Sequence, residues 1–411
     1  MKRVVFLSVL VASTMYATNG DNMIGIGAES RAMGGLGIAL PLGTDSAYSN
    51  PAWVSDSKGF NFSFGATVFM PKVHAKAGPA QMPNGQGIPA SANVKSAADL
   101  SLIPSVSITN NITDNLSYGV GMFGVSGMGV DYRNEDPRLA NMRTALQYMR
   151  FVPSLSYKMD DLHIGVGVTL AYGALSMAAI TPDSKGNRAQ RSGGLSEDFG
   201  VGAQLGLGYR FAKEFTFGAF YQSQINTEYE KLFDFTGDGK YNDLKLSQPA
   251  EAGVGLGYEA DCGCYKFGID YKRILWSKAD GYDAFGWDDQ DVIAVGGSYV
   301  VQDGLTLRAG YNYAPSPLDG KKNFSPATIG GASFPGAFVG FFNTLGFPAY
   351  TDTHYTLGLA YNVSNTTSVD IAYTYAPEVT ETIPSVAQMQ LPSYEASNEQ
   401  SAITMAVKYK F

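Results

Sequence analysis

The stretch Phe60–Met70, FNFSFGATVFM, places an apolar residue at every second position, with Asn61, Ser63, Gly65 and Thr67 between them. A period of two in hydrophobicity is the period of a β-strand, because successive side chains of a strand point to opposite faces. One face of this segment is therefore apolar and aromatic, and the other is small or polar. The stretch predicts a strand with two chemically different faces.

The same pattern recurs along the chain and gives about fourteen predicted strands. The others lie at residues 100–109, 116–122, 151–157, 162–172, 199–211, 215–221, 250–258, 267–271, 293–301, 305–313, 355–361, 369–375 and 403–411. A soluble sandwich turns its apolar face inward, but here the polar face carries many small residues, which suits a roomy lumen. A sheet in lipid must close, because an open edge leaves backbone groups unpaired. The pattern therefore predicts an all-β fold, a transmembrane antiparallel β-barrel of about 14 strands.

The connections between the predicted strands alternate between short and long. Short turns begin near residues 110, 158, 212, 259, 302 and 362, and long connections lie at about 73–98, 133–146, 180–196, 226–247, 277–288, 314–352 and 377–399. Outer-membrane barrels have short periplasmic turns and long outer loops. An even number of strands then puts both ends of the barrel on the periplasmic side, where aromatic residues cluster beside the short turns as in an interfacial girdle.

The last predicted strand ends in Ile403, Met405, Val407, Tyr409 and Phe411. This strict alternation with a terminal Phe resembles the signal that the barrel-assembly machinery reads on outer-membrane proteins. We expect that machinery to be a partner, together with outer-membrane lipid.

The composition agrees with this interpretation. Of 411 residues 48 are glycine, 25 Tyr and 23 Phe, while only 16% are charged, against roughly 25% in average globular chains. The formal charge of -8 argues against nucleic acid as a partner. Residues 1–17 have the basic start, apolar centre and small final residue of a signal peptide, and no later apolar run is long enough for a transmembrane helix.

Residues 18–58 are rich in Gly and Ala and contain no long predicted strand. We expect them to form an N-terminal hatch, or plug, inside a barrel formed by residues 59–411. The residues that single out this segment are Arg31, Gly34, Gly35, Asn50, Pro51 and Ala52. Asn is a good N-cap and Pro fits the first helical turn, so Asn50-Pro51-Ala52 predicts the start of a short helix or a turn.

The order RAMGG at 31–35, DSAY at 45–48 and SNPA at 49–52 resembles the outer-membrane long-chain fatty acid transporter (FadL) family, which includes aromatic-hydrocarbon uptake channels. Further similar segments begin at Phe123, Arg150 and Gly346, and the final KYKF also matches. The resemblance implies a monomeric fourteen-stranded barrel with an N-terminal hatch, a hydrophobic ligand captured from outside, and no cofactor. It covers nearly the whole mature chain.

The resemblance also implies a lateral opening into the membrane at a kink in the third strand. The matching residues are Gly124, Ser126, Gly127 and Gly129. Glycine inside a strand weakens the ladder and permits a bulge or a gap. The alternative is a glycine-rich strand whose small residues make room for the plug.

The long loop at 314–350 carries five Phe among Gly and Pro, and an outer loop this apolar requires a partner. It can fold inward as the wall of a ligand pocket or pack on the plug. The candidate ligand-binding residues are Phe334, Phe338, Phe341, Phe342 and Phe347, with Arg150 and Arg308 as lumen-facing cations for a carboxylate head group. Such lumenal charges can instead pair with each other or with the plug.

Two further short motifs leave alternatives open. Asp234–Asp243 resembles the start of a calcium loop, but Lys245 stands where a bidentate Glu is needed, which favours an Asp-Gly hairpin and no metal. Cys262 and Cys264 can form a local disulfide or remain two thiols of a turn.

The function predicted from the sequence is uptake of hydrophobic molecules, either long-chain fatty acids or aromatic and aliphatic hydrocarbons. The chain has three His, and no Ser/His/Asp grouping at a suggestive spacing, so we do not expect an enzyme. The alternatives are a general diffusion porin for small hydrophilic solutes and a structural or adhesive barrel. A porin needs an open lumen, whereas this chain devotes some forty residues to a plug.

Overall fold

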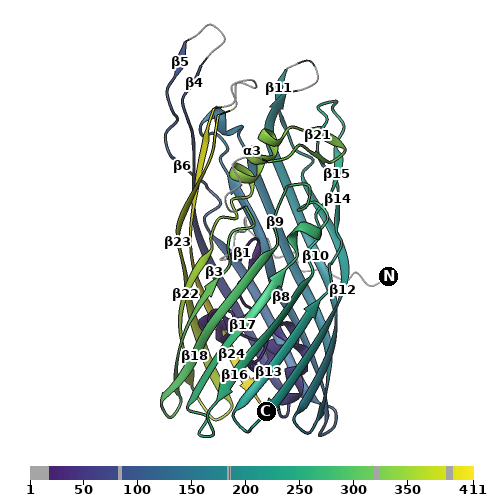
Figure 1. The fold of residues 1–411 in the computed structure, drawn as a ribbon, viewed down its shortest axis with the longest axis vertical. Coiled ribbons are helices and arrows are strands. Elements are labelled where there is room, and N and C mark those ends of the chain that lie inside the picture. The colour runs from purple at the N-terminus through teal and green to yellow at the C-terminus, as the bar shows by residue number, and fades with distance from the viewer. Residues whose placement is uncertain (1–17, 82–85, 183–184, 186, 319–323, 386–391) are drawn as a thin grey trace, which may run out of the picture.

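The computed structural model describes residues 18–81, 86–182, 185, 187–318, 324–385 and 392–411, and the predicted signal peptide lies outside these residues. Within them, fourteen long antiparallel strands form one closed barrel (Figure 1). They are β3 Asn61–Ala77, β7 Ser101–Asn111, β8 Leu116–Asp131, β9 Arg143–Met159, β10 Leu162–Pro182, β12 Leu195–Phe211, β13 Phe215–Gln222, β16 Glu251–Glu259, β17 Tyr265–Ile274, β18 Gln290–Gln302, β19 Leu305–Tyr313, β22 Thr353–Asn362, β23 Thr367–Ile383 and β24 Tyr394–Lys410.

The last strand pairs with the first and closes the ring. The β24–β3 ladder is continuous from Tyr394↔Ala77 to Lys410↔Asn61. At its periplasmic end the Phe411 N–H donates to the Phe60 carbonyl oxygen at 2.9 Å. The predicted fourteen-stranded barrel is confirmed, and both of its ends lie on the side of the short turns.

The apolar faces of the strands point outward. Phe199, Val201 and Leu357 are 76%, 67% and 62% exposed, while their neighbours Gly200, Gly202 and Thr356 are buried. Exposed large apolar side chains in every second position are what a lipid-facing wall requires. No helix among the described residues is both long and apolar enough to cross a membrane.

The chain from Thr18 to Gly59, here called the luminal segment, lies inside the ring of strands (Figure 1, purple). It contains the short pieces β1 Thr18–Asn19, β2 Asn22–Met23, α1 Gly27–Ala32, η1 Gly43–Asp45, α2 Ser46–Ser49 and η2 Pro51–Asp56. Helix α1 packs against β19, β22, β23 and β24, and η2 packs against β8, β9, β10 and β12. The segment therefore contacts opposite sectors of the wall.

The long connections lie at the outer end of the barrel (Figure 1). The longest forms β20 Ala327–Ile329, β21 Ala332–Phe334 and the helix α3 Gly336–Gly346, which the sequence had suggested only as a loop. Buried Val339, Phe342 and Leu345 follow the spacing of one helical face. The connection at 226–247 forms the hairpin β14 Glu228–Phe233 and β15 Asn242–Lys245. The remaining short elements are β4 Ala80–Gln81, β5 Gly87–Ile88, β6 Val94–Lys95, η3 Pro137–Leu139, β11 Arg188–Arg191 and η4 Trp276–Lys278.

The two motifs left open by the sequence have local explanations. The Asp234 carboxylate accepts from Gly237 N at 2.8 Å and Gly239 N at 3.0 Å, and it pairs with Arg191. The Arg191 guanidinium thus takes the place beside the Asp234 carboxylate that a bound calcium ion would need. Cys262 and Cys264 form a disulfide in a periplasmic turn.

One wall carboxylate anchors the centre of the luminal segment. Asp270 of β17 accepts hydrogen bonds from three consecutive backbone N–H groups, those of Gly37, Ile38 and Ala39, at 2.8, 2.9 and 3.3 Å. Hydrogen bonds to a charged group contribute about 1.5–3 kcal/mol each. This side chain therefore holds an otherwise irregular stretch of backbone in the lumen.

We predict that Asp270→Ala loosens the luminal segment without opening the barrel ladder. The expected loss is roughly 3 kcal/mol or more of anchoring free energy, because three buried N–H groups lose their acceptor. The measurements are proteolytic cleavage within residues 18–59 and entry of small hydrophilic solutes into cells. Asp291→Ala, which removes an exposed carboxylate paired with Arg273, is the control. Equal cleavage of the two variants would contradict the anchoring role.

Candidate functional site

The Asn50-Pro51-Ala52 turn connects the luminal segment to the wall. Asn50 Oδ1 accepts from Ala52 N at 3.1 Å, as an N-cap does, and Asn50 Nδ2 donates to Ile38 O at 2.7 Å and to Leu207 O of β12 at 3.1 Å. The turn lies directly on Gly165, where a Cβ would collide with backbone atoms of Pro51 and Ala52. The predicted turn is present as η2.

Gly34 and Gly35 end α1 where the backbone of the segment meets β19. Both have positive φ, 73° and 89°, a conformation that L side chains rarely adopt. Gly34 N donates to Thr356 Oγ1 at 3.0 Å, and Asn312 Nδ2 donates to Gly34 O at 3.0 Å. The two glycines therefore allow a close contact of backbone with backbone.

Arg308 lies in a partly buried cluster of four charges between the segment and the wall. It pairs with Glu29 of α1 at 3.3 Å and with Asp370 of β23 at 3.6 Å. Lys408 pairs with the same two carboxylates at 2.5 and 2.8 Å. Two cations and two anions balance each other, so the guanidinium proposed for a ligand carboxylate already has internal partners.

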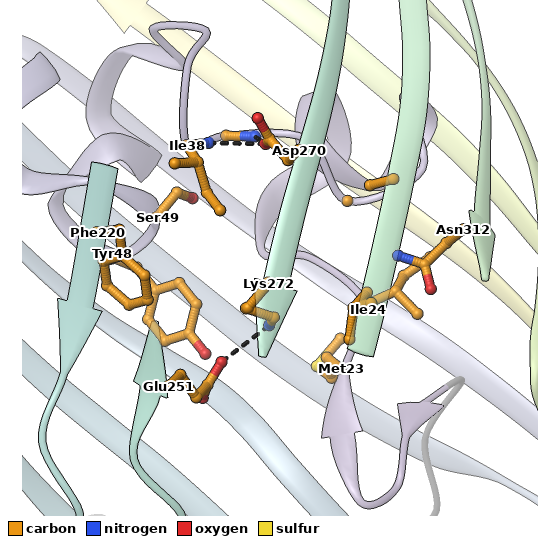
Figure 2. A pocket seen from close by; sticks show the side chains of 14 residues that line it. Met23, Ile24, Ile38, Tyr48, Ser49, Phe220, Glu251, Asp270, Lys272 and Asn312 are labelled. Carbon is orange, nitrogen blue, oxygen red and sulfur yellow. Dashed lines mark hydrogen bonds and ion pairs between the residues drawn. The ribbon is translucent and has the colours of Figure 1, made fainter. Parts of the chain in front are cut away.

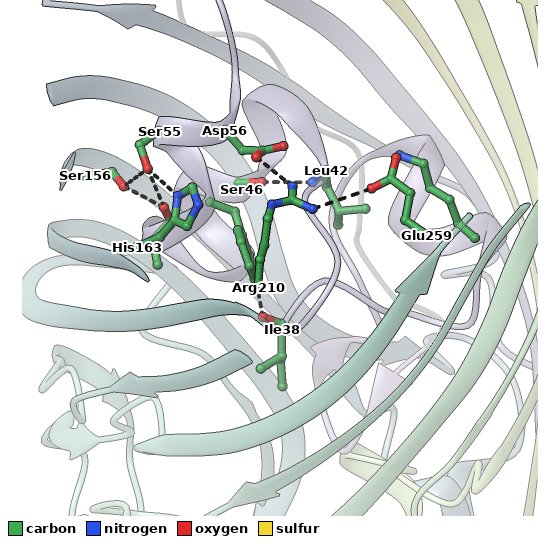
Figure 3. A network of polar contacts seen from close by, with 12 residues as sticks. Ile38, Leu42, Ser46, Ser55, Asp56, Ser156, His163, Arg210 and Glu259 are labelled. Atoms are coloured by element: carbon green, nitrogen blue, oxygen red, sulfur yellow. Dashed lines mark hydrogen bonds and ion pairs between the residues drawn. The ribbon is translucent and has the colours of Figure 1, made fainter. Parts of the chain in front are cut away.

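At the periplasmic end a polar network joins the segment to β9, β10 and β12 (Figure 3). Ser55 Oγ lies 2.8 Å from both His163 Nδ1 and Ser156 Oγ, and Arg210 Nη2 donates to Asp56 Oδ1 at 2.6 Å. His163 Nε2 has no hydrogen-bond partner among the described residues, so no carboxylate completes a catalytic triad. Ser55 and His163 are 108 residues apart, which explains why sequence spacing did not reveal the pair.

Strand β8 separates from β7 within the segment that contains Gly124, Ser126, Gly127 and Gly129, while it stays paired with β9. Its ladder with β7 ends at the pair Ser105↔Phe123, although β8 continues to Asp131. Its ladder with β9 has a bulge between Gly124 and Ser126. All eight residues 123–130 are buried, so the alternation of exposed and buried positions stops here.

Two residues of the freed edge of β8 bond to the luminal segment. Ser126 pairs with Asn22 of β2, and Gly127 N donates to Asp21 O at 3.1 Å. Beyond that, the Gly129 position approaches β9 closely, since a Cβ there would collide with Thr144 O. Ile103 and Phe123, which are 3% and 0% exposed, lie where the β7–β8 ladder ends, and a Cβ at Gly124 would collide with Ile103 Cγ2.

The phenylalanines of the outer loop form an aromatic cluster over the barrel mouth. Phe338 stacks on Phe334 at 4.4 Å between ring centroids, and Phe341 meets Tyr394 at 4.9 Å. Phe342 and Phe347 contact Phe285 at 5.8 and 6.1 Å. The loop therefore packs on the neighbouring outer connection at Phe285 and on Tyr394 of β24.

Arg150 lies deeper, beside a small cavity between the segment and the wall. Its guanidinium pairs with Glu251 at 3.7 Å and lies over the Tyr48 ring at 5.7 Å. The cavity is lined by Tyr48, Phe220, Glu251 and Lys272 among others (Figure 2), and its volume is about 50 Å³. That space holds a few water molecules, since one water needs about 10–15 Å³ on this measure.

Asp21 connects this region with the outer aromatic residues. Tyr282 Oη donates to Asp21 Oδ2, and the Tyr282 ring packs against Trp276 and Trp287 at 4.6 and 4.7 Å. Burial raises the pKa of Asp21 to about 6, against the hydrogen bond from Tyr282 and the charge of Arg150, which lower it. This carboxyl group lies next to the β8 kink.

Comparison with known proteins decides the family. A sequence model described as outer membrane protein transport protein (OMPP1/FadL/TodX) matches residues 7–326. The chain belongs to this family. It is therefore an outer-membrane transport protein and not an enzyme. Outer membrane protein P1 of Haemophilus influenzae is 21% identical, over 90% of this chain and 89% of that protein.

Solved structures of the OMPP1/FadL/TodX family share the fold. A Pseudomonas aeruginosa FadL homologue has a TM-score of 0.73 at 16% identity, covering 95% of this chain and 100% of its own. The Pseudomonas putida toluene transporter TodX has a TM-score of 0.70 at 21% identity, covering 96% and 100%. The Ralstonia pickettii toluene transporter TbuX has a TM-score of 0.68 at 18% identity, covering 94% and 98%.

Two neighbouring glycines of β10 provide a matched test of the contact at Asn50-Pro51-Ala52. We predict that Gly165→Ala destabilises the protein by about 1–3 kcal/mol, because the new methyl group collides with backbone. Gly167→Ala should be tolerated, since a Cβ there meets its nearest atom at 3.4 Å. Heat-induced unfolding in detergent, followed by gel mobility, compares the two. Equal unfolding temperatures would show that the turn does not depend on this contact.

The raised pKa of Asp21 predicts a pH dependence. The folded protein holds the proton up to about pH 6, whereas the ordinary pKa of the group is 3.8. Because the folded state binds more protons between these values, stability falls as pH rises from about 4 to about 6, by at most roughly 3 kcal/mol. Asp21→Asn should remove this part of the dependence. Unfolding temperatures of both proteins from pH 3 to 8 measure it, and parallel curves would contradict it.

Proposed function

We propose that this protein takes up hydrophobic small molecules, long-chain fatty acids or aromatic and aliphatic hydrocarbons, through the outer membrane. Membership of the OMPP1/FadL/TodX family supports this proposal, as do relatives described as a FadL homologue and as toluene transporters. A hydrophobic solute gains free energy by passing from protein to lipid without crossing water. An outer aromatic cluster and a wall that opens toward lipid would serve such a solute better than a water-filled pore.

The observation that carries the exit route is the interruption of the wall after Phe123. Beyond this residue β8 has no β7 partner, and on that side Ser126 and Gly127 bond to the luminal segment. The buried side chains of Ile103 and Phe123 lie at this point, and Leu100 and Leu102 of the preceding chain are 56% and 58% exposed on the outer face. We propose that the ligand leaves here, past Gly124, Ser126, Gly127 and Gly129, into the outer membrane.

Residues 18–58 act as the plug in this proposal, with residues 59–411 as the barrel. The cavity beside Tyr48 is too small for a fatty acyl chain, so passage requires the plug to shift. The ligand is captured at Phe334, Phe338, Phe341, Phe342 and Phe347 and then moves past the plug toward β8. For an acidic ligand, Arg150 at the cavity edge is better placed than Arg308, which is held by two carboxylates.

The luminal segment argues against the alternative that the protein is a general diffusion porin. A general diffusion porin needs a continuous aqueous lumen, whereas here Asp270, Asn50 and the Arg308 cluster fix the segment to separate strands. We further propose that the protein works as a monomer in outer-membrane lipid, and that the barrel-assembly machinery binds its C-terminal strand ending in Phe411.

A pair of opposing variants tests the exit route. Gly124→Trp adds bulk against the side chain of Ile103, whose Cγ2 is the atom nearest to a Cβ at this position. This variant should lower uptake at least tenfold. Ile103→Ala combined with Phe123→Ala removes bulk from the exit route and should raise uptake. The measurement is entry of radiolabelled oleate and of toluene into cells whose only hydrophobic channel is this protein. The favoured compound identifies the ligand class.

Leu205→Trp, on the lipid-exposed face of β12, is the control for added bulk and should leave uptake unchanged. Surface-exposed folded protein is quantified for each variant, so that a loss of assembly is not counted as a loss of transport. Uptake that is unaffected by both exit-route variants would refute lateral exit. Free passage of small hydrophilic solutes through the wild type, without uptake of either hydrophobic compound, would favour a porin.

A further inference from the structure

Arg31 in the last turn of α1 differs from the other buried arginines of the lumen. Its side chain is 0% exposed, and none of its three guanidinium nitrogens has a hydrogen-bond partner among the described residues. Arg150 and Arg308, by contrast, each lie within 4 Å of a carboxylate. Glu29, the acidic residue of the same helix, is engaged by Lys408 and Arg308.

A buried charge without a partner is costly. Removing an ion from water costs several kcal/mol even after the protein relaxes. Burial lowers the pKa of Arg31 to about 10, with no acidic group opposing the shift, and at this value the guanidinium stays charged at neutral pH. The structure around Arg31 therefore requires a source of negative charge that the described side chains do not supply.

The wall beside Arg31 presents further unused donors. His354 of β22 is 0% exposed and interacts electrostatically with Arg31. The Gln400 side chain hydrogen-bonds to one of its ring nitrogens, which leaves the other nitrogen for a further partner. The buried Thr374 hydroxyl of β23 is unpartnered in the described chain. Thr374 pairs in register with Thr356, whose hydroxyl donates to Ala32 O at 3.0 Å, so it lies beside the end of α1.

We propose that Arg31, His354 and Thr374 bind one compact monovalent anion, a halide or a carboxylate group, between the luminal segment and the wall. A guanidinium has only donors, and neutral imidazole and hydroxyl groups each add one. This set of donors suits an anion better than it suits a cation or an apolar group. The anion would join α1 to β22 and β23 and so add an ionic contact between segment and wall.

Bromide is the direct probe, because it can be located by anomalous diffraction. Crystals of the full-length wild-type protein grown in sodium bromide should show an anomalous peak within about 3.5 Å of the Arg31 guanidinium, the reach of a charged hydrogen bond. Arg31→Met should lack the peak, and His354→Phe should weaken it. No peak at Arg31 in the wild type, with water alone in its place, would overturn the proposal whatever the variants do.

A solution measurement gives an independent readout. Binding to the folded state raises the unfolding temperature as the anion concentration rises. Between 10 and 500 mM bromide the wild type should gain roughly 2 °C or more over Arg31→Met, and the difference between the two proteins removes general salt effects. Arg273→Met, which alters an exposed arginine, should follow the wild type. Equal gains in wild type and Arg31→Met would count against a site at Arg31.

Competition distinguishes the two sources of the anion. If decanoate removes the bromide peak but acetate at the same concentration does not, the natural occupant is the head group of a hydrophobic ligand. If acetate and chloride remove it equally well, the occupant is a free small anion. The site itself does not depend on the transport proposal, because bromide binding is measured without uptake.

Discussion

Closure of the sheet is the constraint on which the rest of this structure depends. Lipid offers no hydrogen bonds, so every backbone group of a spanning strand needs a partner from another strand. The unbroken β24–β3 ladder removes the edge that the chain would otherwise leave. Once the ring is closed, outward positions must be apolar, and the interior becomes a separate space that the chain itself fills.

At several points the luminal segment meets the wall through backbone contacts. Small wall residues such as Gly165 and Gly310 let the luminal segment approach until backbone meets backbone. Asp270 and Thr356 then supply the hydrogen bonds that an irregular segment cannot supply for itself. Where β8 loses its β7 partner beyond Phe123, Asn22 and Asp21 of the same segment bond to Ser126 and Gly127.

The sequence predicted the barrel because period-two alternation and loop length are local signals, readable strand by strand. It predicted the Asn50 cap for the same reason. It could not predict the Ser55–His163 contact or the pairing of Asn22 with Ser126, because these depend on how strands far apart in the sequence are placed around the ring. Helix α3 was missed because Phe, Gly and Pro dominate its surroundings, and tertiary packing on Phe285 decides its conformation.

The enclosed position of the luminal segment has a consequence for biogenesis. The segment directly precedes β3, and the strand that seals against β3 is the last of the chain. Zipping of that seam is therefore the step after which residues 18–59 can no longer enter from the side. Since β8 needs Asn22 to satisfy its edge, the nascent chain gains by collapsing its amino-terminal part onto the half-formed wall before the seam is sealed. In this order the luminal segment occupies the inside of the barrel before the β24–β3 ladder closes its wall.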